Sequence, residues 1–315
     1  MIYLKIKENA CIMDEWQPEY EQMMFGPLHT RTTIDRAAEI KFAHMPSKLY
    51  KYRTFSESHT QALCHSVLYS SCPTSFNDFV DTNLVISENA KRKMTQKVYN
   101  SFGIRYGFPN AEVTSVQQFL EIAVDYLQRE SGETTNLLQN AAMLELSVLL
   151  NNKVNQIIED RQEQMRNVFS ACCFSADNKS TLMWAHYADN NQGFCIEYDF
   201  KSEGIKADNV QLMFPVLYKS DARVMIDDID AVDTSYMMYA ATVKEVQWQY
   251  EKEWRRFYLG NEAGPKPMPE PTAIYLGPRV EKTNMNWMRD FCGGRIDMYK
   301  MEYDSTVNSM VPVRC

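Results

Sequence analysis

The chain has 315 residues, 45% of them hydrophobic and 23% charged, which is typical of a folded globular protein and excludes a mainly disordered chain. Its 33 basic and 41 acidic residues give a net charge of -8. This acidic balance argues against binding to nucleic acid irrespective of sequence, which requires a basic surface, and against attachment to a membrane through basic residues.

The sequence predicts a cytoplasmic protein with reduced cysteines. Its start, MIYLKIKENACIMDEW, is interrupted by Lys5, Lys7 and Glu8 and lacks the apolar run of a signal peptide. No stretch approaches the roughly 18 uncharged apolar residues of a membrane span. None of the eight cysteines forms a Cys-x-x-Cys pair, and the five histidines show no metal-ligand spacing, so no structural zinc site is expected.

The first part of the chain is expected to be an extension followed by the start of the main domain. Residues 1–46 are predicted to hold a short strand and then a helix over Thr33–Ala43. From residue 47, KLYKYR alternates as a strand does, and Ser56 is placed to cap a short helix. Val67–Ser71 is a second predicted strand.

Residues 87–166 are predicted to be a helical insertion. One apolar face repeats at three- and four-residue spacing through Val116, Phe119, Leu120, Ala123, Val124 and Leu127. A second long helix is expected from about Leu137.

The second half alternates strands and short helices. NVFSACCFS is apolar on both faces, as a central strand is, and GFCIEYDF alternates. The helix TLMWAHYADN between them is expected to end with Gly193 in the left-handed position. Further strands are expected near Val210–Tyr218, over EKEWRRFYL, over AIYLG and over Asp297–Tyr303, with helices near Thr234–Val246 and Val280–Phe291 and a proline-rich loop at 262–272. We predict one α+β domain over 47–315, with a mixed, mostly antiparallel central sheet.

Two segments near the start of this domain are candidates for ligand binding. In YKYR, the ordinary interpretation is an amphipathic strand, and the functional one is that Arg53 binds an anion beside Tyr52. The segment SSCPTSFND is either a loop that hydrogen bonds its own backbone or a site loop that presents Ser71, Asn77 and Asp78.

Two later segments combine aromatic and titratable residues. In MWAHYADNNQG, His186 is either structural or an acid–base group, with Trp184 and Tyr187 as candidate substrate contacts. In WQYEKEWR, a strand would place Glu251 and Glu253 on one side, either paired with Arg255 on a solvated face or desolvated by the aromatic residues. Desolvation raises the pKa of a carboxylate and suits it to catalysis near neutral pH.

The order of these segments points to a family. FNDFVD, CFS, LMWAHYADNNQGFCIEYDF, W-x-Y-E-K-E-W-R and AIYLG together resemble the prokaryotic family catalogued as domain of unknown function 2971, over about residues 47–280. The resemblance implies a bacterial or phage protein with this fold, and it implies no activity.

The leading functional hypothesis is an ADP-ribosyltransferase-like enzyme that acts on NAD+ as a substrate, and no cofactor is assigned from the sequence. The order of a basic residue on a first strand, a serine-rich strand and a late E-x-E pair resembles that of such enzymes. Here Arg53 would hold the pyrophosphate, and Ser70 or Ser71 would lie on the second strand. Glu253 would stabilise the positive ribose, and Glu251 would orient or deprotonate the acceptor.

Two alternatives remain open from the sequence. One is a non-catalytic binding or regulatory module, in which the aromatic residues are core and the helical insertion contacts a protein partner. The other is a hydrolase or nuclease that depends on a divalent metal and uses Asp78, Asp81, His186 and a glutamate.

Overall fold

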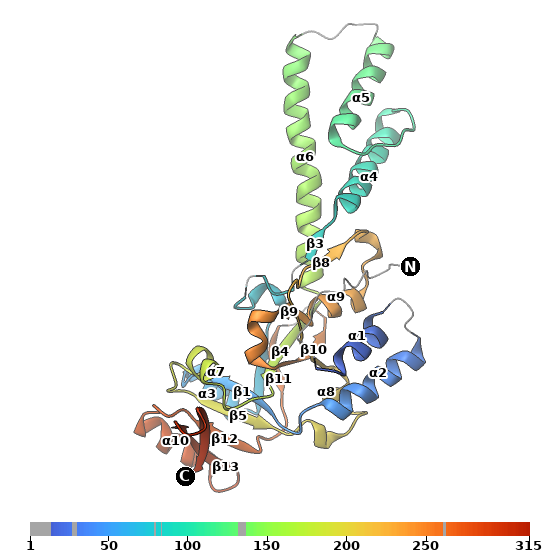
Figure 1. Ribbon diagram of the computed structural model, residues 1–315. Helices are drawn as coiled ribbons and strands as arrows, with labels where there is room; N and C mark the ends of the chain where they lie inside the picture. The colour runs from blue at the N-terminus through green and yellow to red at the C-terminus, as the bar shows by residue number, and fades with distance from the viewer. Residues whose placement is uncertain (1–13, 27–29, 79, 83, 132–136, 261–262) are drawn as a thin grey trace. The chain divides into compact units, whose positions relative to one another are not determined.

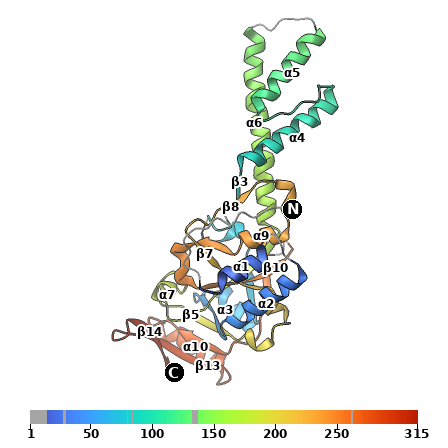
Figure 2. The ribbon, with the colours of Figure 1, turned by 45° about the vertical axis from the view of Figure 1, so that its right-hand side comes forward.

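The computed structural model describes residues 14–26, 30–78, 80–82, 84–131, 137–260 and 263–315, and Figures 1 and 2 show their secondary structure. The chain divides into two compact units. The smaller unit holds the described residues within 84–166 and 223–237, and the larger holds those within 14–82, 167–222 and 238–315. Across these ranges no helix is both long and apolar enough to cross a membrane.

The smaller unit is mostly helical. It contains the helices α4 (Glu88–Tyr106), α5 (Val116–Ser131) and α6 (Leu137–Arg166), the strands β3 (Leu84–Ile86) and β8 (Val224–Ile226), and the short helix η3 (Ile229–Ala231). β3 and β8 pair in parallel, and α5 packs against α6 (Figures 1 and 2). The helices expected within 87–166 are present, and their status as an insertion stays a prediction.

The larger unit is built on an eight-stranded sheet. Its order is β14-β13-β12-β5-β1-β4-β10-β6. The bounds are β1 Leu49–Arg53, β4 Phe169–Ser175, β5 Phe194–Tyr198, β6 Met213–Pro215, β10 Glu253–Leu259, β12 Ala273–Leu276, β13 Asp297–Asp304 and β14 Ser309–Arg314. Only the β12–β13 pair in this sheet is parallel. The predicted α+β class with a mixed, mostly antiparallel sheet is confirmed.

Two short strand pairs and several helices complete this unit. β2 (Val67–Ser70) pairs antiparallel with β11 (Gly264–Pro267), and β7 (Leu217–Lys219) pairs in parallel with β9 (Val243–Glu245). The helices are α1 Gln17–Phe25, α2 Arg31–His44, α3 Glu57–Cys64, α7 Thr181–Tyr187, α8 Asp208–Gln211 and α10 Lys282–Cys292, with the 3-10 turns η1 Pro73–Ser75, η2 Lys201–Glu203 and η4 Val246–Glu251. The boundary between the units falls within α9 (Thr234–Ala240).

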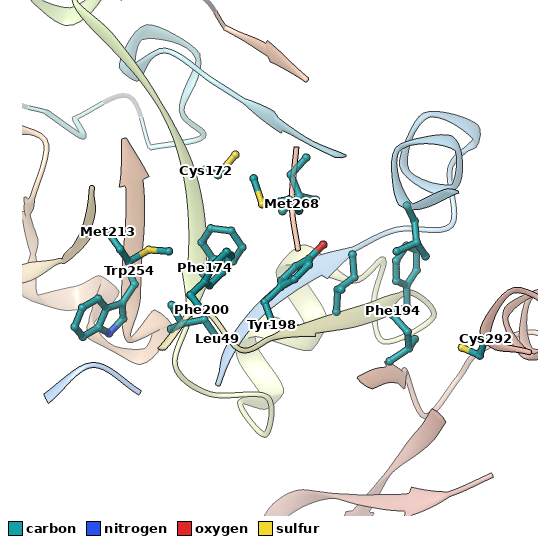
Figure 3. Packing of buried hydrophobic residues seen from close by; sticks show 14 of the residues in the cluster. Leu49, Cys172, Phe174, Phe194, Tyr198, Phe200, Met213, Trp254, Met268 and Cys292 are labelled. Carbon is teal, nitrogen blue, oxygen red and sulfur yellow. The ribbon is translucent and has the colours of Figure 1, made fainter. Parts of the chain in front are cut away.

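The hydrophobic core lies on both faces of the sheet. On one face Phe174 packs edge-on against Phe200, with ring centroids 5.1 Å apart, in a cluster that includes Leu49 (Figure 3). Tyr52 instead joins a second cluster with Trp184. Because side chains alternate along a strand, β1 contributes to both clusters and is fixed from both sides.

Three sequence predictions for this unit are wrong. Val210–Tyr218 is not one strand, because α8 occupies its start and β6 and β7 pair with different neighbours. The helix predicted over Thr234–Val246 ends at Ala240, and β9 then pairs with β7. Part of the 262–272 segment is the strand β11 rather than a loop.

The prolines of β11 fit a strand for a physical reason. Pro265 and Pro267 occupy alternate positions, so both turn the nitrogen that lacks a hydrogen away from β2. The residue after Pro267, Met268, points its backbone N–H the opposite way, toward β2, and donates it to the carbonyl oxygen of Ser66. In this unit α1 and β14 were not predicted, and in the smaller unit β3 and β8 were not predicted either. The strand expected near the start falls outside the described residues.

Candidate functional site

A cavity of about 260 Å³ lies where β1 and β4 separate. The two strands pair at a single position, Tyr50 with Ser175, although β1 pairs with β5 along its whole length. Beyond that pair, Lys51 Nζ donates to the carbonyl oxygen of Cys173 at 2.6 Å, which satisfies a backbone group of β4 that has lost a strand partner. Residues of both strands line the cavity, together with residues from η1 and its following loop, α7, β9, η4 and β10.

One wall of the cavity is a buried ion network centred on Lys244. Its Nζ lies 2.6 Å from Oε2 of Glu251, 3.1 Å from Oε2 of Glu253 and 3.7 Å from Oδ2 of Asp81. Arg255 binds Asp81 with two hydrogen bonds of 2.8 and 2.6 Å and Glu253 with two of 2.9 and 3.0 Å. Three carboxylates therefore share two cations, which leaves one excess negative charge when all five groups are ionised.

The two glutamates of this network have opposite proton affinities. Burial, together with the nearby charge of Glu253, raises the pKa of Glu251 above its usual range. Burial acts in the same direction on Glu253, but Arg255 and Lys244 outweigh it and hold the pKa of Glu253 well below its usual range. Two neighbouring carboxylates with separated pKa values are the arrangement that lets one exchange protons while the other stays charged.

The other wall carries two cations from β1. Burial lowers the pKa of Lys51 to about 8 and also lowers the pKa of the Arg53 guanidinium. Within the described ranges neither side chain forms an ion pair with a carboxylate, and the hydrogen bond from Arg53 to the carbonyl of Tyr52 is long, at 3.5 Å. A desolvated guanidinium without a carboxylate partner is suited to an anionic ligand.

Helix α7 joins the acidic wall to the loop after η1. The Tyr187 hydroxyl donates to Oε1 of Glu251 at 2.6 Å and accepts from Nδ2 of Asn77 at 2.8 Å. The Phe76 ring of the same loop lies against the Arg255 guanidinium, with 5.1 Å between ring centroid and Cζ. This packing places Asn77 beside the acid–base candidate.

The turn after α7 fixes the end of β1. Asp189, Asn190 and Asn191 have φ angles of 48°, 52° and 73°, a left-handed region that Asn and Asp tolerate better than most residues. A Cβ on Gly193 would lie 2.1 Å from the carbonyl oxygen of Arg53. The predicted role of Gly193 as the residue after the helix end is wrong, because Asp189, Asn190 and Asn191 take the left-handed conformation there. A glycine is required at position 193 for the close approach to Arg53.

Seven of the ten predicted site residues line this cavity. They are Tyr52, Arg53, Ser71, Asn77, Tyr187, Glu251 and Glu253. Glu251, however, ends η4 rather than lying on β10, and Lys252 between the two glutamates is left-handed, with φ 44°. The interpretation that Glu253 and Arg255 pair on a solvated face is also wrong, because both are buried.

Three predicted site residues do not line it. His186 is exposed, and its Nδ1 lies 3.3 Å from the hydroxyl of Tyr250. Trp184 is fully buried and donates from Nε1 to the carbonyl of Asn178 at 2.7 Å, as a core tryptophan does. Asp78 accepts from the backbone N–H of Val80, while its Oδ2 is buried without a hydrogen-bond partner.

Sequence reasoning missed two residues that matter most to the electrostatics. Lys244 fell inside a predicted helix, and the carboxylates that it binds come from three separate segments. Lys51 was interpreted only as a strand cation. For Lys244 the local pattern holds one usable signal, the apolar–polar alternation over residues 241–244 just before the aromatic segment.

The described residues offer no group of three or more His, Cys, Asp or Glu side chains placed to hold a metal ion. Asp81, one of the ligands that the metal-dependent alternative requires, is held instead by Arg255. That alternative therefore has no geometric support from the residues proposed for it.

The comparison with known families gives one match. The chain matches the family described as a protein of unknown function (DUF2971) over residues 183–256. The resemblance inferred from the sequence is confirmed, and the matched segment runs from α7 to β10, so it contains Lys244, Glu251 and Glu253. No curated protein and no solved structure matches the chain. The description of DUF2971 names no activity, so the function has to be argued from the cavity.

Proposed function

We propose that the cavity binds a phosphorylated ribonucleotide and that its two glutamates promote cleavage of the glycosidic bond, with NAD+ as the substrate. The observation that carries the proposal is the pair Glu251 and Glu253, which share Lys244 at a cavity wall while their pKa values move in opposite directions. Such a split separates one proton-exchanging carboxylate from one permanent charge.

The cationic wall supports an anionic ligand. Arg53 supplies a planar fork of donors for phosphate oxygens, and Lys51 adds a second positive charge on the same strand. The cavity volume of about 260 Å³ lies just below the range of roughly 300 Å³ and more that is usual for small-molecule pockets. It would therefore hold the reacting nucleotide half of NAD+ rather than the whole molecule.

The chemistry assigns a different task to each glutamate. As the bond between ribose C1′ and the nicotinamide nitrogen breaks, its electron pair leaves with nicotinamide and positive charge develops on the ribose. The persistent negative charge of Glu253 and the excess charge of the network stabilise that cation. Water forms the new bond to C1′ and gives its proton to the Glu251 carboxylate, which later releases it to solvent.

Nicotinamide release from NAD+ tests this proposal. Glu251→Gln removes the base and is expected to lower the rate by about 10²-fold or more, the usual contribution of a general base. Glu253→Gln is expected to lower kcat because it removes the negative charge beside the ribose. It should also lower the pKa of Glu251, but only by the part that the charge of Glu253 contributes. Circular dichroism shows whether each variant folds.

A matched control comes from the same sheet. Glu197 is also a buried carboxylate that accepts a 2.6 Å hydrogen bond from a tyrosine, Tyr275, but it does not line the cavity. Glu197→Gln should leave the rate within about twofold of the wild type. Equal losses in Glu251→Gln and Glu197→Gln, or no nicotinamide release by the wild-type protein, would reject the proposal.

One observation favours the non-catalytic alternative. Glu253 is paired with both Arg255 and Lys244, and this closed network can serve to hold the fold rather than a reaction. In that case NAD+ or ADP-ribose raises the melting temperature of the protein, and nicotinamide is not released. Binding without turnover would assign the protein to the class of nucleotide-binding modules.

A further inference from the structure

A second cavity adjoins the site. It has a volume of about 250 Å³ and is lined by Arg53, Ser58, His59, Ala62, Leu68 and Tyr69, which come from the end of β1, from α3 and from β2. Arg53 and Tyr69 also line the first cavity. The two cavities therefore share two lining residues, one of them a cation and the other an aromatic residue.

The lining of the second cavity is suited to a flat, mostly apolar group. Ala62 and Leu68 are buried apolar side chains, while Tyr69 is 57% exposed and leaves its ring available for stacking. Any of the nucleobases can stack on such a ring, because every base has an aromatic face.

His59 adds a polar contact of defined type. Its Nδ1 lies 3.2 Å from the carbonyl oxygen and 3.0 Å from the hydroxyl of Thr54. A carbonyl oxygen only accepts, so Nδ1 carries the hydrogen and Nε2 of the neutral ring is an acceptor. Burial and the nearby Arg53 lower the pKa of His59, which keeps the ring neutral at neutral pH and fits the hydroxyl or amino donors of a nucleoside.

We propose that the second cavity is a nucleoside subsite and that the ligand is a dinucleotide whose diphosphate link lies at Arg53. The reacting nucleotide then occupies the first cavity, and the second nucleoside enters the cavity formed by α3 and β2. This inference rests on the proposed function, because its first test measures cleavage of the glycosidic bond. It goes further in that a mononucleotide would fill only one of the two cavities.

The test compares two substrates that carry the same glycosidic bond, NAD+ and nicotinamide mononucleotide. Ala62→Phe fills the second cavity with an aromatic ring. It is expected to raise the KM for NAD+ about tenfold, the loss of one stacked base, and to leave the KM for the mononucleotide within about twofold. Gln61→Phe adds the same ring at the neighbouring exposed position of α3, outside the cavity, and should change neither KM.

A second variant covers the case in which Ala62→Phe does not fold. Ser58 is exposed and lines the second cavity, so Ser58→Trp obstructs it without disturbing the core. The same selective rise in the KM for NAD+ is expected. A rise of equal size for both substrates, or for neither, would overturn the nucleoside subsite while leaving the proposed function standing.

Binding separates the two proposals if the wild-type protein cleaves neither substrate. Titration calorimetry then compares the affinities for intact NAD+ and for the mononucleotide directly. Tighter binding of NAD+ that is lost in Ser58→Trp supports the subsite although the catalytic proposal has failed. Equal affinities, or no binding of either compound, would overturn the subsite as well.

Discussion

Two buried carboxylates of the larger unit, Glu251 at the end of η4 and Glu197 on β5, have nearly the same immediate contacts. Their exposed fractions are 3% and 7%, and each accepts a 2.6 Å hydrogen bond from a tyrosine hydroxyl, Tyr187 and Tyr275 respectively. Each also has a lysine within 3.4 Å. By these contacts alone, either residue would pass for an acid–base candidate.

The difference lies in what else the lysine binds. Lys48, beside Glu197, has a side chain that is one-third exposed, and it also pairs with Asp199 near the surface. Lys244, beside Glu251, is buried and divides its charge among three carboxylates. Both glutamates are thus buried and hydrogen bonded to a tyrosine. Of the two, only Glu251 shares a buried lysine with two other carboxylates.

The largest expected effect on this comparison comes from Asp81→Asn. The substitution removes the carboxylate that holds Arg255 with two hydrogen bonds, and it leaves a buried guanidinium with one carboxylate fewer. We expect the free energy of unfolding to fall by about 3–5 kcal/mol, as for other broken buried ion pairs. Urea denaturation followed by tryptophan fluorescence measures it.

Glu197→Gln is the matched control for that loss. It keeps the shape of the side chain and the tyrosine near it, so the expected loss is about 1–3 kcal/mol, the cost of one imperfectly satisfied buried group. If both variants lose the same free energy of unfolding, breaking the ion network at Lys244 costs no more than changing Glu197, and the distinction between the two sites is wrong.

The pH dependence of stability should separate Glu251 from Glu253. The folded-state pKa of Glu253 is lowered, so its contribution to the free energy of unfolding is present above the unfolded value of 4.5 and is lost as the pH falls below it. The folded-state pKa of Glu251 is raised, so any contribution it makes is present below the unfolded value and is lost as the pH rises through the folded one.

Unfolding free energies of the two glutamine variants, compared with the wild type between pH 2 and pH 8, measure these opposite slopes, because the loss for Glu253 falls below pH 4.5. The wild type should lose its advantage over Glu253→Gln toward acid and its advantage over Glu251→Gln toward base. Slopes of the same sign in both comparisons would contradict the division of labour between the two glutamates.

The elements that the sequence predicted well are those with strong local patterns. β1, β4 and β5 follow alternating or continuous apolar runs, and Ser56 caps α3 by accepting from the backbone N–H of His59. The missed strand β11 has no such pattern, because its prolines conceal an edge strand whose pairing with β2 is decided by the tertiary fold.

The candidate site shows the same limit. Aromatic residues around Glu251 and Glu253 marked them as desolvated carboxylates, and the structure buries both. The cavity itself arises because β1 and β4 separate after one residue pair. The sequence of a strand does not indicate the residue at which its pairing with a neighbouring strand ends. Lys244 was missed for a related reason, since its partners are near only after β9 pairs with β7.

The smallest expected effect, and the sharpest for the comparison, comes from removing one hydroxyl at each site. The bond from Tyr187 lowers the pKa of Glu251 because it stabilises the ionised carboxylate. Tyr187→Phe should therefore raise that pKa further and move the acidic limb of the pH–rate profile for NAD+ cleavage to higher pH, with a loss of stability of about 1 kcal/mol.

Tyr275→Phe deletes the equivalent 2.6 Å bond to Glu197 and should cost a similar amount of stability. It should leave the pH–rate profile in place, because Glu197 does not line the cavity. Unfolding experiments alone cannot tell the two hydroxyls apart, so the profile is the deciding measurement. If the acidic limb of the profile moved equally in both variants, the pH dependence of the rate would reflect the charge of the protein in general and not the protonation of Glu251.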